Sequence, residues 1–196
     1  MYSVSKYIHI ENGSIFENGK QIVDSNTTDF SEFIKQVYRN FEHIYPKFYK
    51  MDDLCKLAYI ASELVLKDET EKDIALLFSN NEGSLDTDYK HQQSIQNNDA
   101  YFPSPAVFVY TLPNIAIGEV SIRHQLKSES AFFIASEYQT DYMHQYTEHL
   151  LRTNKAKKVL CGWVHCLNGA YKACFYLVET NGILEHNNQN IKQITK

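Results

Sequence analysis

Ser136 is the residue whose type and position most suggest a nucleophile. It stands between a short apolar run and a segment with helical spacing, and three histidines lie near it in the sequence: His124, His144 and His149. A serine whose proton is taken by a histidine is the nucleophile of many hydrolases. The sharp elbow of one such class needs glycines on both sides of the serine, G-x-S-x-G, and Ser136 has neither. Chance placement is the favoured interpretation, and a hydrolase is the alternative.

Cys161, His165 and Cys166 offer a second chemistry, because thiolates and imidazoles are common ligands of zinc. Their run VLCGWVHC has the composition of a strand, in which residues 161 and 165 share a face and residue 166 points away. A joint metal site would strain that strand, so we interpret the three as packed core residues and expect no metal and no cofactor. The four cysteines have no framework spacing, which indicates buried, reduced thiols in a cytoplasmic protein.

The bulk properties of the chain indicate a folded protein of modest size. Its 196 residues suit one domain, which we place at residues 1–180, with the polar residues 181–196 as a frayed tail. A net charge of −5 without a long basic run makes nucleic acid an unlikely class of partner. No apolar run approaches the roughly 20 residues of a membrane span, and no signal peptide is recognised at the start.

Turn and helix signals are clear in the first half of the chain. Asn12-Gly13 and Asn18-Gly19 separate short apolar runs, which predicts an N-terminal strand followed by a turn or hairpin. Apolar residues at helical spacing predict one helix over residues 30–41 and a second that begins near Asp52. The continuous apolar run at residues 73–79 is typical of a strand that is covered on both faces.

The second half continues the alternation of strands and helices. Residues 80–103 are polar and without apolar periodicity, and they predict a long loop. Apolar spacing from Tyr142 predicts a helix, and two strands at residues 159–166 and 170–179 follow it, joined by a tight turn. The fold class is therefore α/β, with a mixed sheet of about five strands covered by helices.

The stretch from Ser104 to Glu137 has the most distinctive pattern. It reads Ser-Pro, then Leu-Pro-Asn, a glycine, an Ile-Arg pair, and Leu-Lys before the apolar run AFFIA. The helical segment MDDLCKLAYIASELVL and the strand DIALLFS precede it, and KAKKVLCGWVHC, with Gly162, follows it. In this order and spacing, residues 50–180 resemble the N-terminal half of the β-ketoacyl synthases, the condensing enzymes that have the thiolase fold.

That resemblance implies a buried strand at residues 131–135 that leads directly into a helix. The family places its nucleophilic cysteine at this junction, where the helix N-terminus lowers the pKa of a thiol. In this chain the position falls on Glu137, which we expect to stand at the helix N-terminus, and no cysteine is near. Motifs of the family's C-terminal half, with its two catalytic histidines, are not found. The resemblance therefore implies no catalytic residue for condensation, as in the family's chain-length-factor subunits.

The same resemblance implies two contact surfaces. Four aromatic residues would approach a partner or its acyl pocket, with the protein's own core as the alternative role: Phe132, Phe133, Tyr138 and Tyr142. Four basic residues would dock an acidic acyl carrier protein, with a solvated helix end as the alternative: Arg152, Lys155, Lys157 and Lys158.

Three functions follow as expectations. The first is a ketosynthase-like subunit without its own condensing activity, which forms a heterodimer with a full-length β-ketoacyl-[acyl-carrier-protein] synthase in fatty-acid, polyketide or aryl-polyene-type pigment synthesis. The second is a self-standing decarboxylase or acyl-thioester hydrolase that uses Glu137 or Ser136. The third is a homodimeric acyl-binding or scaffold protein. The last two are alternatives to the first.

Overall fold

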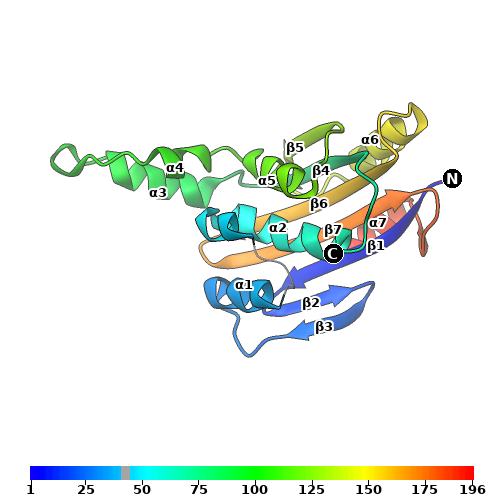
Figure 1. The fold of residues 1–196 in the computed structure, drawn as a ribbon, viewed down its shortest axis with the longest axis horizontal. Helices are drawn as coiled ribbons and strands as arrows, with labels where there is room; N and C mark the ends of the chain where they lie inside the picture. Colours follow the sequence, from blue (N-terminus) through cyan, green and yellow to red (C-terminus); the bar gives the residue numbers. More distant parts are fainter. Residues whose placement is uncertain (41–44) are drawn as a thin grey trace.

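A mixed sheet forms the centre of the molecule and carries helices on both faces (Figure 1). The computed structural model describes residues 1–40 and 45–196. Within that part of the chain the sheet has eight strands, in the order β3-β2-β1-β7-β6-β4-β5, with β8 paired to β1. The strands are β1 (Ser3–Glu11), β2 (Ser14–Glu17), β3 (Lys20–Asp24), β4 (Ile74–Asn80), β5 (Ser130–Ile134), β6 (Lys158–Leu167), β7 (Ala170–Glu179) and β8 (Leu184–Glu185). The α/β class and the mixed sheet are confirmed.

Asn-Gly pairs make three of the tight turns, two of them at the predicted N-terminal positions. Asn12 and Gly13 have φ values of 48° and 79°, and Asn18 and Gly19 have 50° and 79°. Asn168 and Gly169 repeat the pattern between β6 and β7. Positive φ at both central residues suits the twist of antiparallel neighbours, so each turn joins adjacent strands. The N-terminal hairpin prediction is confirmed and extends to a third strand, β3.

One face of the sheet is covered by α1 (Phe30–Arg39), α2 (Asp53–Leu66) and α5 (Ile115–His124), with the 3₁₀ turn η1 (Pro46–Lys50) between α1 and α2. Asp29 and Asp52 cap the first two helices by accepting a backbone N–H three residues on. Of the 14 residues of α2, 11 are buried. Both predicted helices are confirmed, although Phe41, which the pattern assigns to the first, lies outside the described residues.

The opposite face is covered by α6 (Thr140–Arg152) and α7 (Asn188–Ile194). The helix predicted from Tyr142 is confirmed as α6. The expectation of a frayed tail at residues 181–196 is wrong, because β8 pairs with β1 and α7 packs on α6. Only Ile191 and Ile194 of α7 are buried, so its order depends on tertiary burial and not on a strong local pattern.

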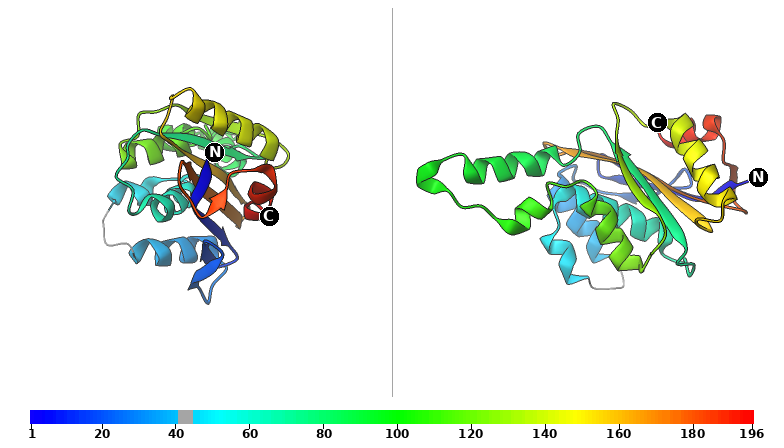
Figure 2. Two further views of the ribbon diagram at one scale, coloured as in Figure 1. Left: turned by 90° about the vertical axis from the view of Figure 1, so that its right-hand side faces the viewer. Right: turned by 90° about the horizontal axis from the view of Figure 1, so that it is seen from above.

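An arm of two helices projects from one end of the molecule, as Figure 2 shows from above. It consists of α3 (Leu85–Ile95), the turn η2 (Asn98–Ala100) and α4 (Pro105–Val109). The prediction of a loop over residues 80–103 is therefore wrong. Only Thr87 of α3 is buried, and a helix that buries so little leaves no apolar stripe in the sequence. An ion pair of 2.6 Å between Lys90 and Asp86, one turn apart, supports it instead.

Two features of the sheet differ from expectation. It has eight strands in the described residues, because β2, β3 and β8 add to the five that the sequence indicated. The strand expected at residues 131–135 is β5, and it lies at the edge of the sheet. None of its five residues is buried: the two at its ends are exposed and the three between them are half-buried. The expectation that it is a buried strand is wrong. None of the helices in residues 1–40 and 45–196 combines the length and apolarity needed to cross a bilayer.

Replacement of Gly162 by alanine should destabilise the protein by about 1–3 kcal/mol, because the core has no room for the methyl group. An added Cβ would lie 2.7 Å from Cζ of Phe175, whose ring is fully buried and packs against Phe78 at 4.7 Å between ring centroids. Urea unfolding monitored by circular dichroism measures the change in the free energy of unfolding.

Gly118→Ala is the matched control for that measurement. Gly118 lies within α5, and an added Cβ meets nothing within 4 Å. Alanine should therefore stabilise the helix by up to about 1 kcal/mol. Equal unfolding midpoints for Gly162→Ala and the wild-type protein would contradict the packing described for β6.

Candidate functional site

Glu137 lies in the segment that connects β5 to α6. The strand pairing continues to Ala135, whose N–H donates to the carbonyl of Asn80 at 2.9 Å. Ser136 and Glu137 follow as exposed bend residues, and α6 begins only at Thr140, after the N-cap Gln139. Glu137 thus stands in the connection ahead of the helix, and the expectation that it occupies the helix N-terminus is wrong. The carboxylate faces solvent at a prominent turn.

Ser136 is not paired with a histidine in the described part of the chain. His124 points to Glu63, with 3.1 Å between its Nε2 and a carboxylate oxygen. His144 Nε2 lies 3.1 Å from the backbone carbonyl of His186. His149 is exposed on α6. The base that a serine nucleophile needs is therefore not assembled at Ser136 in this structure.

The four aromatic residues that the sequence groups together separate into different surroundings. Phe132 packs against the core on the α2 and α5 face, and Phe133 points to the α6 face, because neighbouring strand residues alternate. Phe133 and Tyr142 meet edge to face, with 5.2 Å between ring centroids. Tyr138 turns inward, and its hydroxyl shares a 2.7 Å hydrogen bond with that of Tyr176. Burial raises the pKa of both phenols well above the ordinary value.

The outer edge of β5 is the most open part of this region. β4 pairs with one side of β5, and among the described residues no strand pairs with the other. Ile134 on this strand is 55% exposed, and large apolar residues are also exposed on the neighbouring helices, at Ile122 of α5 and Tyr142 of α6. An edge strand presents free N–H and C=O groups for pairing with another chain. Strand order, which sequence reasoning did not predict, decides this property.

The basic residues that follow α6 are only partly free. Lys158 is the first residue of β6, with its Nζ 2.6 Å from Glu69 and 3.0 Å from Glu179. Lys157 pairs with Glu71 at 3.0 Å. Arg152 and Lys155 are exposed and form no ion pair with the described residues. Lys155 lines an open cleft of about 1000 Å³, together with two further lysines, Lys72 and Lys127.

An ionic cluster lies between α2 and α5, and Arg123, the arginine of the Ile-Arg pair in the sequence pattern, is part of it. The buried carboxylate of Glu63 accepts from Arg123, with Nε at 2.7 Å and Nη2 at 3.3 Å, and His124 approaches it at 3.1 Å. Burial by itself would raise the pKa of Glu63, but hydrogen bonds from His124 and Arg123 lower it below its ordinary value. The guanidinium also lies over the ring of Tyr45, 5.5 Å from its centroid. The cluster holds α5 on α2 through contacts among Glu63, Arg123 and His124.

No thiol in the protein is prepared for nucleophilic attack. All four cysteines are free and buried, as the sequence predicts. Burial raises the pKa of Cys161 to about 11 and that of Cys174 to about 12, and it raises those of Cys55 and Cys166 as well. His165 pairs with Glu82 at 2.6 Å instead of sharing a ligand site with the two neighbouring cysteines. The core interpretation of Cys161 and Cys166 is confirmed.

No protein-family model matches the sequence, and no curated protein sequence matches it. Solved structures do match the fold. The ishigamide ketosynthase/chain length factor superposes with a TM-score of 0.69 at 17% identity, over 91% of this chain and 62% of that chain. A ketosynthase (ApeO) in complex with its chain length factor (ApeC) from Xenorhabdus doucetiae gives 0.61 at 15% identity, over 92% and 79%.

A third match is AntDE:AntF, a type II acyl carrier protein in complex with its ketosynthase, with a TM-score of 0.67 at 14% identity over 92% of this chain and 62% of that chain. The protein thus spans less than two thirds of two of these three chains. The chain has a thiolase-type fold like that of ketosynthases and chain length factors, as its sequence pattern implies.

Proposed function

We propose that this protein is a ketosynthase-like subunit without condensing activity of its own, which pairs with a full-length β-ketoacyl-[acyl-carrier-protein] synthase. One observation carries the proposal: a ketosynthase-type fold presents the exposed Glu137 at the junction where condensing enzymes hold a cysteine. A carboxylate cannot carry an acyl chain as a thioester, and the described residues show no histidine at the junction to move a proton. The pathway it serves would be fatty-acid, polyketide or aryl-polyene-type pigment synthesis.

The partner would pair along the edge of β5. Among the described residues no strand pairs with one side of β5, Ile134 is exposed, and no charged residue lies from Ala131 to Ile134. Strand addition to such an edge supplies backbone hydrogen bonds, and the apolar side chains add buried area. In the isolated chain the same edge would favour association, because native edges are normally covered or charged.

The aromatic residues next to that edge would bound the partner's acyl cavity. Phe133 and Tyr142 form one cluster with Tyr146 on the α6 side of β5, and Phe132 lies on the other side. Tyr138 supports the junction from inside through its bond to Tyr176. Large rigid rings at this place would limit the length of chain that a shared cavity accepts.

An acidic acyl carrier protein would dock through the basic groups that remain free. Arg152 and Lys155 carry this proposal, because Lys157 and Lys158 already pair with glutamates. The cleft beside Lys155 is of mixed charge, because Lys72 and Lys127 line it together with Glu71 and Asp73. Basic surface groups mainly accelerate encounter with a partner of opposite charge, so the contribution of Arg152 and Lys155 should fall as salt rises.

The partner surface is tested by Ile134→Lys. Co-expressed with a full-length ketosynthase from the same genome, the wild-type chain should form a heterodimer, measured by size-exclusion chromatography with light scattering. A lysine at the free edge opposes strand pairing, and it should weaken the complex at least about tenfold. Ile22→Lys is the matched control, because Ile22 is 44% exposed on β3, at the opposite edge of the sheet.

Equal weakening by the two lysine substitutions would contradict pairing through β5. A chain that stays apart from every ketosynthase of its genome would overturn the proposed function. A homodimer that Ile134→Lys dissociates, with no heterodimer formed, would replace it with the homodimeric scaffold.

The alternative function, a self-standing decarboxylase or hydrolase, is tested by the substitutions Glu137→Ala and Ser136→Ala. Within residues 1–40 and 45–196 neither residue has a partner that activates it, so the purified wild-type chain should decompose malonyl and acyl thioesters no faster than buffer does. Both variants should leave the condensing rate of the heterodimer within about twofold, since neither group takes part in the chemistry. Turnover by the isolated chain that disappears in Glu137→Ala or Ser136→Ala would establish a decarboxylase or a hydrolase instead.

Alkylation of the cysteines tests whether any of the four thiols is reactive in the folded protein. At pH 8 the folded protein should resist alkylation by iodoacetamide, because a pKa of about 11 leaves Cys161 only about one part in a thousand as thiolate. Unfolding in guanidinium should expose all four thiols, counted by intact mass. A single thiol that reacts within minutes in the folded state would mean that the core described here does not protect it.

A further inference from the structure

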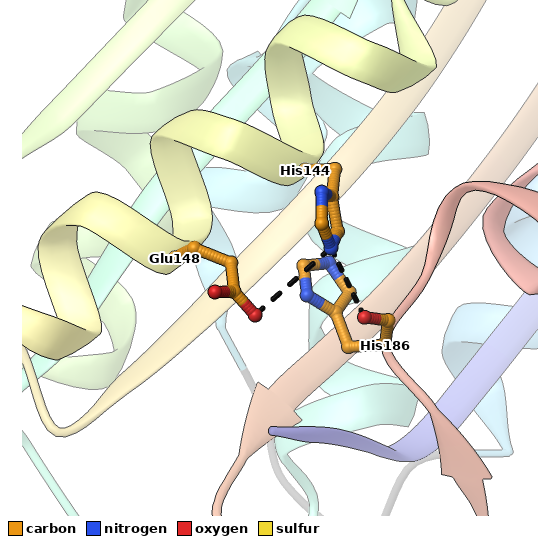
Figure 3. Close-up of side chains that lie close together, drawn as sticks. All are labelled: His144, Glu148 and His186. Atoms are coloured by element: carbon orange, nitrogen blue, oxygen red, sulfur yellow. Dashed lines mark hydrogen bonds and ion pairs between the residues drawn. The ribbon is translucent and has the colours of Figure 1, made fainter. Parts of the chain in front are cut away.

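Three side chains with metal-binding atoms converge on the α6 face, away from the edge of β5. His144 and Glu148 stand one turn apart on α6, and His186 reaches them from the segment after β8 (Figure 3). Their ligand atoms all lie within 4.8 Å of one another. His144 Nε2 is 3.9 Å from the Glu148 carboxylate, and the rings of His144 and His186 are 4.8 Å apart between centroids.

His186 is the unexplained member of this group. Its side chain is 3% exposed, yet neither ring nitrogen has a hydrogen-bond partner among the described residues. Buried polar groups in native proteins almost always have a partner, so two unmatched nitrogens on one ring need a cause. The ring lies against those of His144 and Tyr176, which offer it no acceptor in this arrangement.

We propose that His144, Glu148 and His186 bind a divalent transition-metal ion of the Zn²⁺ type. Two imidazoles and one carboxylate suit zinc and not magnesium or calcium, which prefer oxygen ligands throughout. Zinc holds nitrogen and oxygen at about 2.0–2.2 Å, so two ligands of a tetrahedral ion lie about 3.4 Å apart. The ligand atoms of the three groups lie within 4.8 Å of one another, and side-chain rotations that shorten the widest separation by about 1.4 Å would close them around the ion.

One side of the three-residue group is open to solvent, so a metal ion could enter there and keep a water molecule as its fourth ligand. The side chains of His144 and Glu148 are 25% and 30% exposed, whereas His186 forms the floor of the group. An ion would enter from the solvent side and retain a water molecule there as its fourth ligand. It would replace the hydrogen bond that His144 Nε2 now makes to the carbonyl of His186.

Binding would fasten the C-terminal segment to α6. His186 connects β8 to α7, and α7 already packs on α6, where Asn188 donates to Asp141. A ligand that binds only the folded form raises its apparent stability in proportion to the logarithm of its concentration over its Kd. The metal site is a property of the isolated chain and does not depend on the proposed ketosynthase partner.

The full-length chain is titrated with Zn²⁺ in competition with a chromophoric chelator at pH 7.5. One equivalent should bind with a Kd of about 1 μM or tighter, and the melting temperature should rise with added Zn²⁺. Glu148→Gln and His144→Gln keep the side-chain shape or bulk but remove a ligand, and each should weaken binding at least about tenfold. His149→Gln is the matched control, because His149 is an exposed histidine beside Glu148 on the same helix.

Cobalt distinguishes this site from binding to cysteine. The Co²⁺ complex of the wild-type chain should show d–d absorption of a site with nitrogen and oxygen ligands and no thiolate-to-cobalt charge transfer. Charge-transfer bands, absence of binding in the wild-type chain, or affinities unchanged by both ligand substitutions would overturn the proposal. Equal weakening by His149→Gln would do the same, since it would mean that any histidine of α6 suffices. Far-ultraviolet circular dichroism confirms that the variants remain folded.

Discussion

The burial of α2 determines how one whole face of the protein is built. This helix is covered nearly all round, by β1, β6 and β7 beneath it and by α1 and α5 at its sides. Its one buried carboxylate, Glu63, needs a compensating charge there, and Arg123 of α5 supplies it, with His124 beside it at 3.1 Å. A buried carboxylate that lost its partner would cost about 3–5 kcal/mol. α5 is thus held in a fixed place by a charge on its neighbour and not only by apolar contact.

The position of α5 sets where the next strand can go. β5 begins a few residues after α5 and pairs with the free side of β4, the strand whose seven residues are all buried. No strand in residues 1–40 and 45–196 follows beyond it, so β5 carries one satisfied side and one open side. The stretch from Ser104 to Glu137 is therefore anchored from within by α2 and turned outward at its end. β5 is fixed in place by its pairing with β4, and the backbone groups of its other side are open, so this edge is well suited to contact with another chain.

The parts of this fold that the sequence predicted are those whose cause is local. Asn-Gly turns need positive φ, and α1 and α2 have apolar residues at helical spacing, so both were recognised. α3 and α7 were missed because one is solvated and the other depends on two buried isoleucines that dock on distant strands. The exposure of β5 and the separation of Glu137 from α6 were missed because they follow from strand order and the helix start, which no local pattern shows.

α6 connects the two surfaces proposed for the protein. It starts just after the junction of Ser136 and Glu137, and one turn further along it carries His144. Tyr138, in the junction itself, bonds to Tyr176, and the ring of Tyr176 lies 6.2 Å from that of His186. An ion held by His144, Glu148 and His186 would thus fix α6 against the same buried tyrosine that anchors the junction. Because α6 and β5 also share the Phe133–Tyr142 contact, restraint at the proposed metal site would stiffen the edge of β5 that is proposed for partner binding.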